Sequence, residues 1–260
     1  MPNLQQLFSL KEKYGTLSSS ENIAKDFIER SRIKSKTIQK SFSFNERNLL
    51  ESFDVANGRP DLLKYFESSP KEEVVLLFID ITGFSKIIKD KTSLYLRSYL
   101  NDYYSKLIPI IYQYDGQIEK IMGDGIICVF GNPFIKQKPI SWIVGYAENC
   151  AKDAIKLFKD SDKAVKVALH IGDITYYKIP SDYYEEFTMI GSPLTELYRL
   201  ESVSFGDSIN FYKGSKYDSL NPRDAGNIFS DINKEEVRIY GEDISLPGVD
   251  YKRLRYLKFV

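Results

Sequence analysis

The chain has 260 residues, 43% of them hydrophobic, which is enough for one large domain with a sizeable core. Lysine plus arginine and aspartate plus glutamate each number 36, so the basic excess typical of nucleic-acid binders is absent. No apolar run approaches the roughly 20 residues of a membrane helix, and the start "MPNLQQLFSLKEKYG" lacks the pattern of a secretion signal. We therefore expect a cytoplasmic protein with no membrane and no nucleic-acid partner.

Residues 1–70 predict an N-terminal arm, not a separate sensor domain. A helix-start signal at Ser20 and Glu21 precedes apolar residues at helical spacing. Farther along, short apolar clusters alternate with Asn-Gly and Pro. The segment is short and interrupted, so we expect a helical or irregular arm that packs on a neighbour, followed by one folded domain over residues 71–260.

The apolar pattern of that domain predicts an α+β fold. The expected elements are, in chain order, a strand at 74–79, a helix between 94 and 111, a hairpin of strands 117–122 and 125–130, a helix at about 140–158, a strand pair around Gly172-Asp173 and a helix within 190–204. The order strand, helix, hairpin, helix, strand is that of the ferredoxin-like split βαβ core. It predicts an antiparallel-dominated sheet backed by helices.

Two aspartates fall at the ends of neighbouring predicted strands. Asp80 follows the run "VVLLFI", and Asp124 lies at the hairpin tip. Carboxylate oxygens are ligands that Mg²⁺ and Mn²⁺ prefer. The small residues of "ITGFS" predict a turn into a helix start, whose backbone N–H groups suit a phosphate. The alternative is a capping role for Asp80 and a turn role for Asp124; their joint placement, with Gly83 and Gly123, favours a metal site.

These stretches resemble a known family. "FIDITGFS" and "EKIMGDGIICVFG" resemble the two metal motifs of class III nucleotide cyclases, the adenylate and guanylate cyclase catalytic domains. "HIGDI" and "FTMIGSPLTELYRLES" resemble, less specifically, a later strand and a helix of the family. The resemblance covers roughly residues 72–260. It implies an enzyme that converts a nucleoside triphosphate into a 3′,5′-cyclic nucleotide and pyrophosphate with two divalent metal ions, Mg²⁺ or Mn²⁺.

The same resemblance assigns roles by motif position. The implied residues are the metal ligands Asp80, Asp124 and the Ile81 carbonyl, the phosphate-binding backbone of Thr82, Gly83, Phe84 and Ser85, the catalytic pair Arg199 and Thr195, and the base-binding pair Lys120 and Thr188. Arg199 occupies the position of the family's arginine that stabilises the transition state. There a forked guanidinium group reaches the oxygens of a pentavalent phosphorus better than a lysine ammonium does. The alternative for Arg199 is an ordinary surface arginine.

Two positions depart from the family pattern. Thr195 stands where asparagine is usual, one helical turn before Arg199. Tyr240 stands where a phosphate-binding lysine is common, and Arg238 and Lys252 are its candidate replacements. In the family, sites form across a head-to-tail dimer, so the resemblance implies a C2 homodimer.

The base is the least determined feature. Guanylate cyclases typically carry glutamate and cysteine where this chain has Lys120 and Thr188, and lysine with aspartate or threonine is an adenylate pattern. Stand-alone bacterial cyclases with an N-terminal arm, which make cyclic UMP or CMP in anti-phage signalling, are also similar. There a bulky aromatic narrows the base pocket, a role open to Tyr65 or Phe66 unless they pack in the core. We favour a pyrimidine, UTP or CTP, because we recognise no sensor domain to regulate cyclic AMP; ATP is the alternative.

Other classes fit less well. Diguanylate cyclases share the strand-end metal logic, but their hairpin reads Gly-Gly-Asp/Glu-Glu-Phe, which "MGDGII" does not match. A non-catalytic nucleotide-binding module derived from a cyclase stays open: Thr195 and Tyr240 favour it, whereas the two aspartates and Arg199 oppose it. The single histidine, His170, lies in an apolar strand, which predicts a structural role.

Overall fold

The computed structural model describes residues 60–135, 138–178, 187–220, 228–230 and 236–259. Most of the predicted arm, including the helix-start signal at Ser20, lies outside these residues. In the part of the chain that the structure describes, no helix is both long and apolar enough to cross a bilayer.

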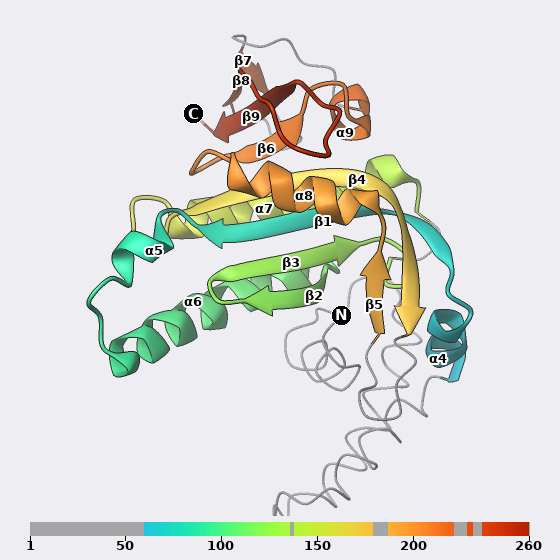
Figure 1. The fold of residues 1–260 in the computed structure, drawn as a ribbon, viewed down its shortest axis with the longest axis horizontal. Coiled ribbons are helices and arrows are strands. Elements are labelled where there is room, and N and C mark those ends of the chain that lie inside the picture. The colour runs from blue at the N-terminus through green and yellow to red at the C-terminus, as the bar shows by residue number, and fades with distance from the viewer. Residues whose placement is uncertain (1–59, 136–137, 179–186, 221–227, 231–235, 260) are drawn as a thin grey trace, which may run out of the picture.

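The elements form one large mixed sheet with helices on both faces (Figure 1). In chain order they are α4 (Pro60–Glu67), β1 (Lys71–Ile81), α5 (Phe84–Ile87), α6 (Ser93–Gln113), β2 (Gln117–Met122), β3 (Gly125–Phe130), α7 (Ile140–Phe158), β4 (Val165–Lys178), β5 (Phe187–Ile190), α8 (Ser192–Ser202), β6 (Ile209–Tyr212), α9 (Lys216–Leu220), β7 (Ile228–Ser230), β8 (Glu236–Asp243) and β9 (Arg253–Phe259).

The sheet order confirms the ferredoxin-like prediction. The described strands run β2-β3-β1-β4-β6-β9-β8-β7, with β5 paired to β4. The first four are antiparallel neighbours, and their order is that of the split βαβ core, in which α6 joins β1 to β2 and α7 joins β3 to β4. The β4–β6 pair is parallel.

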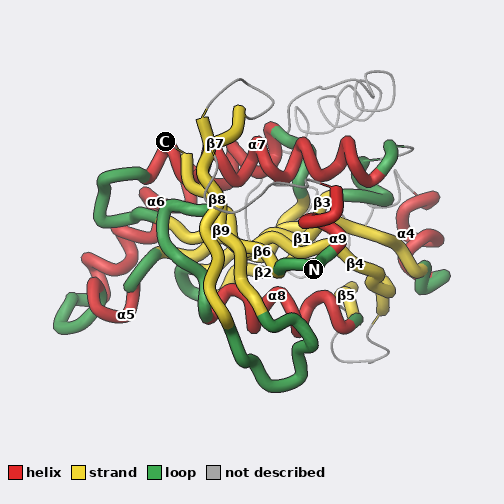
Figure 2. Tube along the Cα trace, turned by 90° about the horizontal axis from the view of Figure 1, so that it is seen from above, coloured by secondary structure: helices red, strands yellow, loops and turns green. Residues whose placement is uncertain are grey.

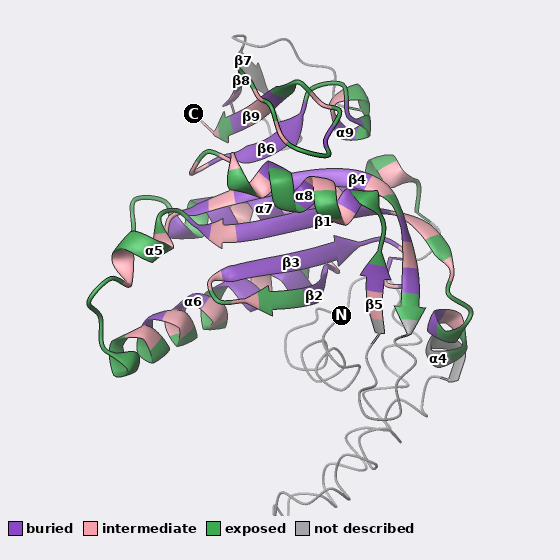
Figure 3. Ribbon diagram, in the orientation of Figure 1, coloured by how far each residue is buried: buried purple, intermediate pink, exposed green. Residues whose placement is uncertain are grey.

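Helices α6 and α7 cover one face of this core and α8 covers the other, as Figures 1 and 2 show. Strand β1 is central, so its side chains alternate between two hydrophobic cores. Leu77 and Ile79 pack with α6 and α7, whereas Leu76 and Phe78 pack with α8. Figure 3 shows β1 and β3 mostly buried, whereas the outer strand β2 is buried in its first half and partly exposed toward the hairpin tip.

The strand pair predicted around Gly172-Asp173 is wrong. Strand β4 continues from Val165 to Lys178 and pairs with β1 from Lys71↔Thr175 to Ile81↔Val165. Gly172 allows close packing at this point, because a Cβ there would lie 2.4 Å from Cγ of Pro193 in α8. The glycine therefore marks the approach of a helix to the strand and not a turn.

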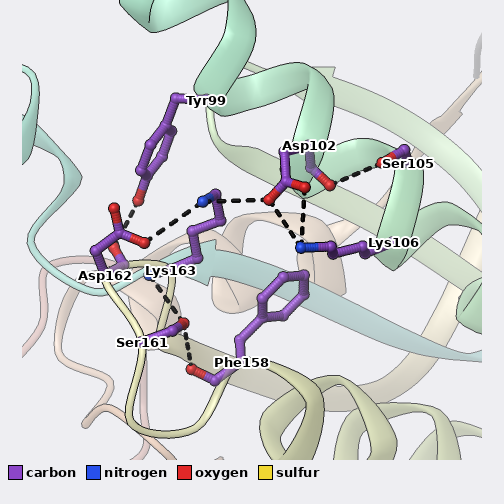
Figure 4. Close-up of polar contacts among 8 residues, drawn as sticks. All are labelled: Tyr99, Asp102, Ser105, Lys106, Phe158, Ser161, Asp162 and Lys163. Carbon is purple, nitrogen blue, oxygen red and sulfur yellow. Dashed lines mark hydrogen bonds and ion pairs between the residues drawn. The ribbon is translucent and has the colours of Figure 1, made fainter.

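A polar cluster fastens α6 to the loop between α7 and β4 (Figure 4). The Lys163 ammonium lies 3.2 Å from Asp102 and 4.4 Å from the centre of the Tyr99 ring. The Tyr99 hydroxyl donates to the Asp162 carbonyl at 2.5 Å. The carbonyl of Ala164, the residue after Lys163, accepts a hydrogen bond from the Thr82 N–H at 2.8 Å. The cluster therefore helps to position the turn that follows β1.

Candidate active site

The two predicted metal-binding aspartates come together. Strands β1 and β3 are antiparallel, and the pair Ile79↔Ile126 brings the end of β1 beside the hairpin tip. There the carboxyl groups of Asp80 and Asp124 lie close enough for Asp124 to raise the pKa of Asp80. Gly125 provides the space, because a Cβ at this residue would lie 3.2 Å from Oδ1 of Asp80.

Burial disfavours the ionised form of both aspartates, and for Asp80 the neighbouring Asp124 adds to this effect. Burial, followed by the charge of Asp124, raises the pKa of Asp80 to about 6, although Lys166 and a hydrogen bond with Glu201 partly oppose the shift. Burial also raises the pKa of Asp124, against the stabilising effect of its hydrogen bonds, including one from the Ile81 backbone. Two half-buried carboxylates that repel each other are suited to sharing a cation.

Two further charged residues join the pair, and neither was predicted from the sequence. Lys166 lies opposite Asp80 in the β1–β4 ladder, with Nζ 3.5 Å from Oδ2 of Asp80. The same Nζ lies 2.6 Å from Oε1 of Glu201 in α8. When all three carboxylates are ionised, the lysine leaves two net negative charges, the complement of one divalent cation.

The donor set fits a hard divalent ion that keeps other oxygen ligands. Among the described residues, no group of three or more aspartate, glutamate, histidine or cysteine side chains is placed to hold a metal. The carboxylates predicted as ligands are those of Asp80 and Asp124, and the Ile81 carbonyl is the predicted third ligand. Mg²⁺ is commonly held by one or two carboxylates together with substrate phosphates.

The turn after Asp80 has the expected form. Gly83 adopts the left-handed conformation, with φ 73°, and is the N-cap of α5, so Asp80 does not cap that helix. The first hydrogen bond of the turn runs from the Lys86 N–H to the Gly83 carbonyl, so α5 itself does not use the N–H groups of residues 83–85. The N–H of Thr82 is already bonded to Ala164, which leaves this residue its exposed hydroxyl for a phosphate.

Arg199 and Thr195 both lie on the exposed side of α8. Other side chains of the same helix contact β4, where Glu196 lies 2.6 Å from His170 and Glu201 lies 2.6 Å from Lys166. Among the described residues, neither Arg199 nor Thr195 forms a hydrogen bond or ion pair with Asp80 or Asp124.

The predicted base-binding residues lie on the neighbouring strands. Lys120 is exposed on β2, and Thr188 is partly buried on β5. The Thr188 hydroxyl donates at 3.2 Å to Oε1 of Glu119, a residue the sequence reasoning missed. Glu119 is 5% exposed and lies where the β2–β3 register shifts between Ile118 and Lys120. No pattern in the sequence indicates this shift, so the burial of Glu119 could not be predicted.

Comparisons with known proteins agree with this geometry. Residues 66–245 match the family described as the Adenylate and Guanylate cyclase catalytic domain. The chain belongs to this family, the class III nucleotide cyclases. Rat adenylate cyclase type 10 is 26% identical over 170 residues, which is 58% of this chain and 10% of that protein. The chain thus spans about a tenth of the length of the first curated relatives.

Solved structures show the same cyclase-domain fold. The adenylyl cyclase CyaB of P. aeruginosa is 22% identical, with a TM-score of 0.55, and covers 74% of this chain and 95% of its own. The guanylate cyclase domain of RhGC from Catenaria anguillulae, solved in complex with GTP, is 19% identical, with a TM-score of 0.58, covering 73% and 98%. A non-canonical dimeric guanylyl cyclase domain of the RhoGC fusion protein from Blastocladiella emersonii is 18% identical, with a TM-score of 0.55, covering 74% of this chain and 99% of its own.

The aromatic residues before β1 pack within the cyclase domain. Phe66 is fully buried, with its ring centre 5.1 Å from that of Tyr176 in an edge-to-face contact. Tyr65 is partly buried, and its hydroxyl donates to Glu72. The structure therefore places Phe66 in the core, which was the alternative to a role in the base pocket.

Tyr240, at the position where the family usually has a lysine, packs against another aromatic side chain. The Tyr240 ring stacks on Tyr256, with centroids 5.1 Å apart. Of the two candidate replacements, Lys252 is exposed and follows Tyr251, whose ring stacks on Tyr212 at 4.5 Å. The Tyr212 hydroxyl donates to the Glu196 carbonyl of α8 at 2.8 Å, so the stacked Tyr212 and Tyr251 rings lie beside that helix.

Proposed function

We propose that this protein is a nucleotidyl cyclase that converts a nucleoside triphosphate into a 3′,5′-cyclic nucleotide and pyrophosphate. The observation that carries the proposal is the convergence of Asp80 and Asp124 beside the Thr82–Ser85 turn. In the reaction the ribose 3′-hydroxyl loses its proton and its oxygen bonds to the α-phosphorus. The bond from that phosphorus to the oxygen bridging to the β-phosphorus breaks, and pyrophosphate leaves with the electron pair.

Asp80, Asp124 and the Ile81 carbonyl would hold two divalent ions, Mg²⁺ or Mn²⁺. When bound, such ions supply Lewis-acid stabilisation of the triphosphate and favour ionisation of the 3′-hydroxyl. The protein positions its own groups around them. Lys166 and Glu201 orient the Asp80 carboxylate, and the N–H groups of residues 83–85 and the Thr82 hydroxyl bind phosphate oxygens.

A C2 homodimer completes the site. Arg199 lies on the exposed side of α8 in one protomer, so a second copy is the natural source of the guanidinium that stabilises charge on the α-phosphate. Thr195, one turn earlier on the same side, would bond the ribose or a water molecule. In such a dimer Lys120 and Asp124 of one protomer serve different sites.

For the base we propose a pyrimidine, as UTP or CTP, with the cyclic product acting as an anti-phage second messenger. The burial of Phe66 removes one candidate for narrowing the pocket and leaves Tyr65. The alternative is ATP, which the pair Lys120 and Thr188 favours.

Product analysis tests the proposal directly. Purified protein is incubated with Mn²⁺ and each of the four nucleoside triphosphates, and the products are identified by mass spectrometry. Asp80→Ala and Asp124→Ala should abolish cyclisation without unfolding the protein, whereas Asp243→Ala, at a side chain 85% exposed, should not. Absence of any cyclic nucleotide from the folded dimer would favour the non-catalytic nucleotide-binding module instead.

A further inference from the structure

A β-bulge in β2 brings a buried carboxylate to the predicted base-binding position. The β2–β3 ladder pairs Ile118 with Cys128 and Lys120 with Ile127, so Glu119 is the extra residue on β2. It is 5% exposed and accepts the hydrogen bond from Thr188. Bulges redirect side chains and are over-represented beside active sites.

The surroundings of Glu119 hold its carboxylate in place. Its negative charge adds to burial in raising the pKa of Tyr198, in α8, and of Tyr176, in β4. The carboxylate is therefore bonded to β5 through Thr188 and lies close enough to α8 and β4 for its charge to act on Tyr198 and Tyr176. A buried carboxylate that accepts a hydroxyl proton makes a stronger hydrogen bond than a neutral group does, and breaking it is costly.

This bond decides what Thr188 can offer to a ligand. A threonine hydroxyl has one hydrogen to donate and two lone pairs that accept. An ionised carboxylate only accepts, so the hydroxyl donates in the bond to Glu119. The hydroxyl hydrogen of Thr188 is thereby occupied. A ligand group that hydrogen-bonds to the Thr188 oxygen must therefore be a hydrogen-bond donor.

We propose that Glu119, acting through Thr188, makes the base-binding position an acceptor. It thereby selects cytosine and adenine, which carry an amino group at C4 of the pyrimidine or C6 of the purine, over uracil and guanine, which carry a carbonyl at that carbon. The inference rests on the proposed function, because Thr188 must face the base. A carbonyl oxygen placed against the Thr188 lone pairs would stay unpaired, the kind of mismatch that sites built around hydrogen bonds reject strongly.

Lys120 strengthens the same selection from the next position along β2. Its ammonium carries donors alone. Cytosine and adenine have an unprotonated ring nitrogen beside the amine, which can accept from a lysine, whereas uracil and guanine carry a hydrogen there. The two residues thus present an acceptor and a donor in the order that amino bases complement. The predicted selection does not depend on the size of the base. It favours CTP among the pyrimidine nucleotides and ATP among the purine nucleotides.

The test begins with the unmodified protein. The kcat/KM of all four nucleoside triphosphates is measured with Mn²⁺, and the Kd of the four 3′-deoxynucleoside triphosphates, which bind but cannot cyclise, is measured in parallel. We expect CTP over UTP and ATP over GTP, each by about tenfold or more. Ratios near one, or a preference for UTP or GTP within either pair, would overturn the inference while a cyclase remained. If nothing is cyclised the proposed function fails, and the Kd ratios still decide the inference.

Variants separate a positioning role from a structural one. In Glu119→Gln the side-chain amide can donate to the Thr188 oxygen, so the hydroxyl hydrogen becomes available for a carbonyl base. The ratio of kcat/KM for CTP to that for UTP should fall about tenfold, with the Mn²⁺ dependence unchanged. Glu242→Gln, at an exposed glutamate of β8, is the matched control.

A double variant tests whether Glu119 acts through Thr188. In the Thr188→Val background, Glu119→Gln should leave the base ratio unchanged, because the hydroxyl is already gone. An equal loss for all four nucleotides in Glu119→Gln, with the ratio preserved, would show a structural role alone and overturn the inference. Unfolding midpoints of each variant identify any that fail to fold, and the ratios of the unmodified protein stand without them.

Discussion

Replacing Asp80 by asparagine should stabilise the metal-free protein. The side chain of Asp80 is 18% exposed, and its pKa is raised from 3.8 to about 6. Because the pKa of Asp80 is higher in the folded state than in the unfolded state, ionisation of this carboxyl destabilises the fold. The free energy of unfolding should therefore fall as pH rises from about 4 through about 6. A shift of about two pKa units corresponds to about 3 kcal/mol above pH 7.

The asparagine keeps the shape and removes the charge, but it also removes the attraction to Lys166. We therefore expect a gain of about 1–3 kcal/mol in the free energy of unfolding at pH 7.5, which is about 2–10 °C in Tm for a protein of this size. At pH 5 the gain should fall to about half, because the folded wild-type carboxyl is then mostly protonated.

The assay is urea and thermal unfolding in EDTA, with wild type and variant at the same protein concentration because the proposed dimer links stability to concentration. Asp243→Asn, at an exposed side chain, is the control and should change nothing. Adding Mn²⁺ should raise the wild-type Tm and leave that of Asp80→Asn almost unchanged. An Asp80→Asn variant no more stable than wild type at pH 7.5 without metal would refute the idea that the site is strained by like charge.

Three further predictions concern assembly and packing. Mixing Asp80→Ala with Arg199→Ala protein should restore part of the cyclase activity, since one of the two sites in each heterodimer keeps both groups; demonstrated heterodimers without activity would contradict the shared site. Phe66→Ala should destabilise the fold by about 3–5 kcal/mol in urea unfolding, because this ring is fully buried; a stable variant with altered base preference would return Phe66 to the pocket. His170→Phe should cost about 1–3 kcal/mol, as it removes the hydrogen bond that lowers the pKa of Glu196; unchanged stability would show that this bond does not fasten α8.

The parts of the fold that local signals determine could be predicted from the sequence. The hairpin strands 117–122 and 125–130 and the helix 140–158 agree with the structure to the residue, because each is bounded by a strong turn signal or a clear apolar period. Asp80 and Asp124 could be paired in advance since both fall at ends of strands that the βαβ order makes adjacent. The turn predicted at Gly172 was wrong because the sequence does not distinguish a glycine required for helix packing from a glycine required for a turn.

The rest of the site depends on contacts between distant parts of the chain. Lys166 meets Asp80 through the register of β1 and β4, and Glu201 reaches both from α8. A sequence shows neither the register nor the side of a helix that a partner strand will occupy. The bulge at Glu119 is similar, because one residue of slippage in a strand turns a side chain from one face to the other without any change in composition.

The β2–β3 hairpin links two parts of the proposed chemistry. Its tip carries Asp124, and its bulge carries Glu119 and Lys120 a few residues away on the same strand pair. In the proposed dimer the tip serves one site and the bulge serves the other, so the two sites share a rigid element. The Tyr104 hydroxyl from α6 donates to the Gly123 carbonyl at the tip, and Glu119 is bonded to β5 at the other end. In the proposed dimer, a ligand that shifted the bulge would therefore act, through the β2–β3 pairing, on the metal ligand Asp124 of the opposite site.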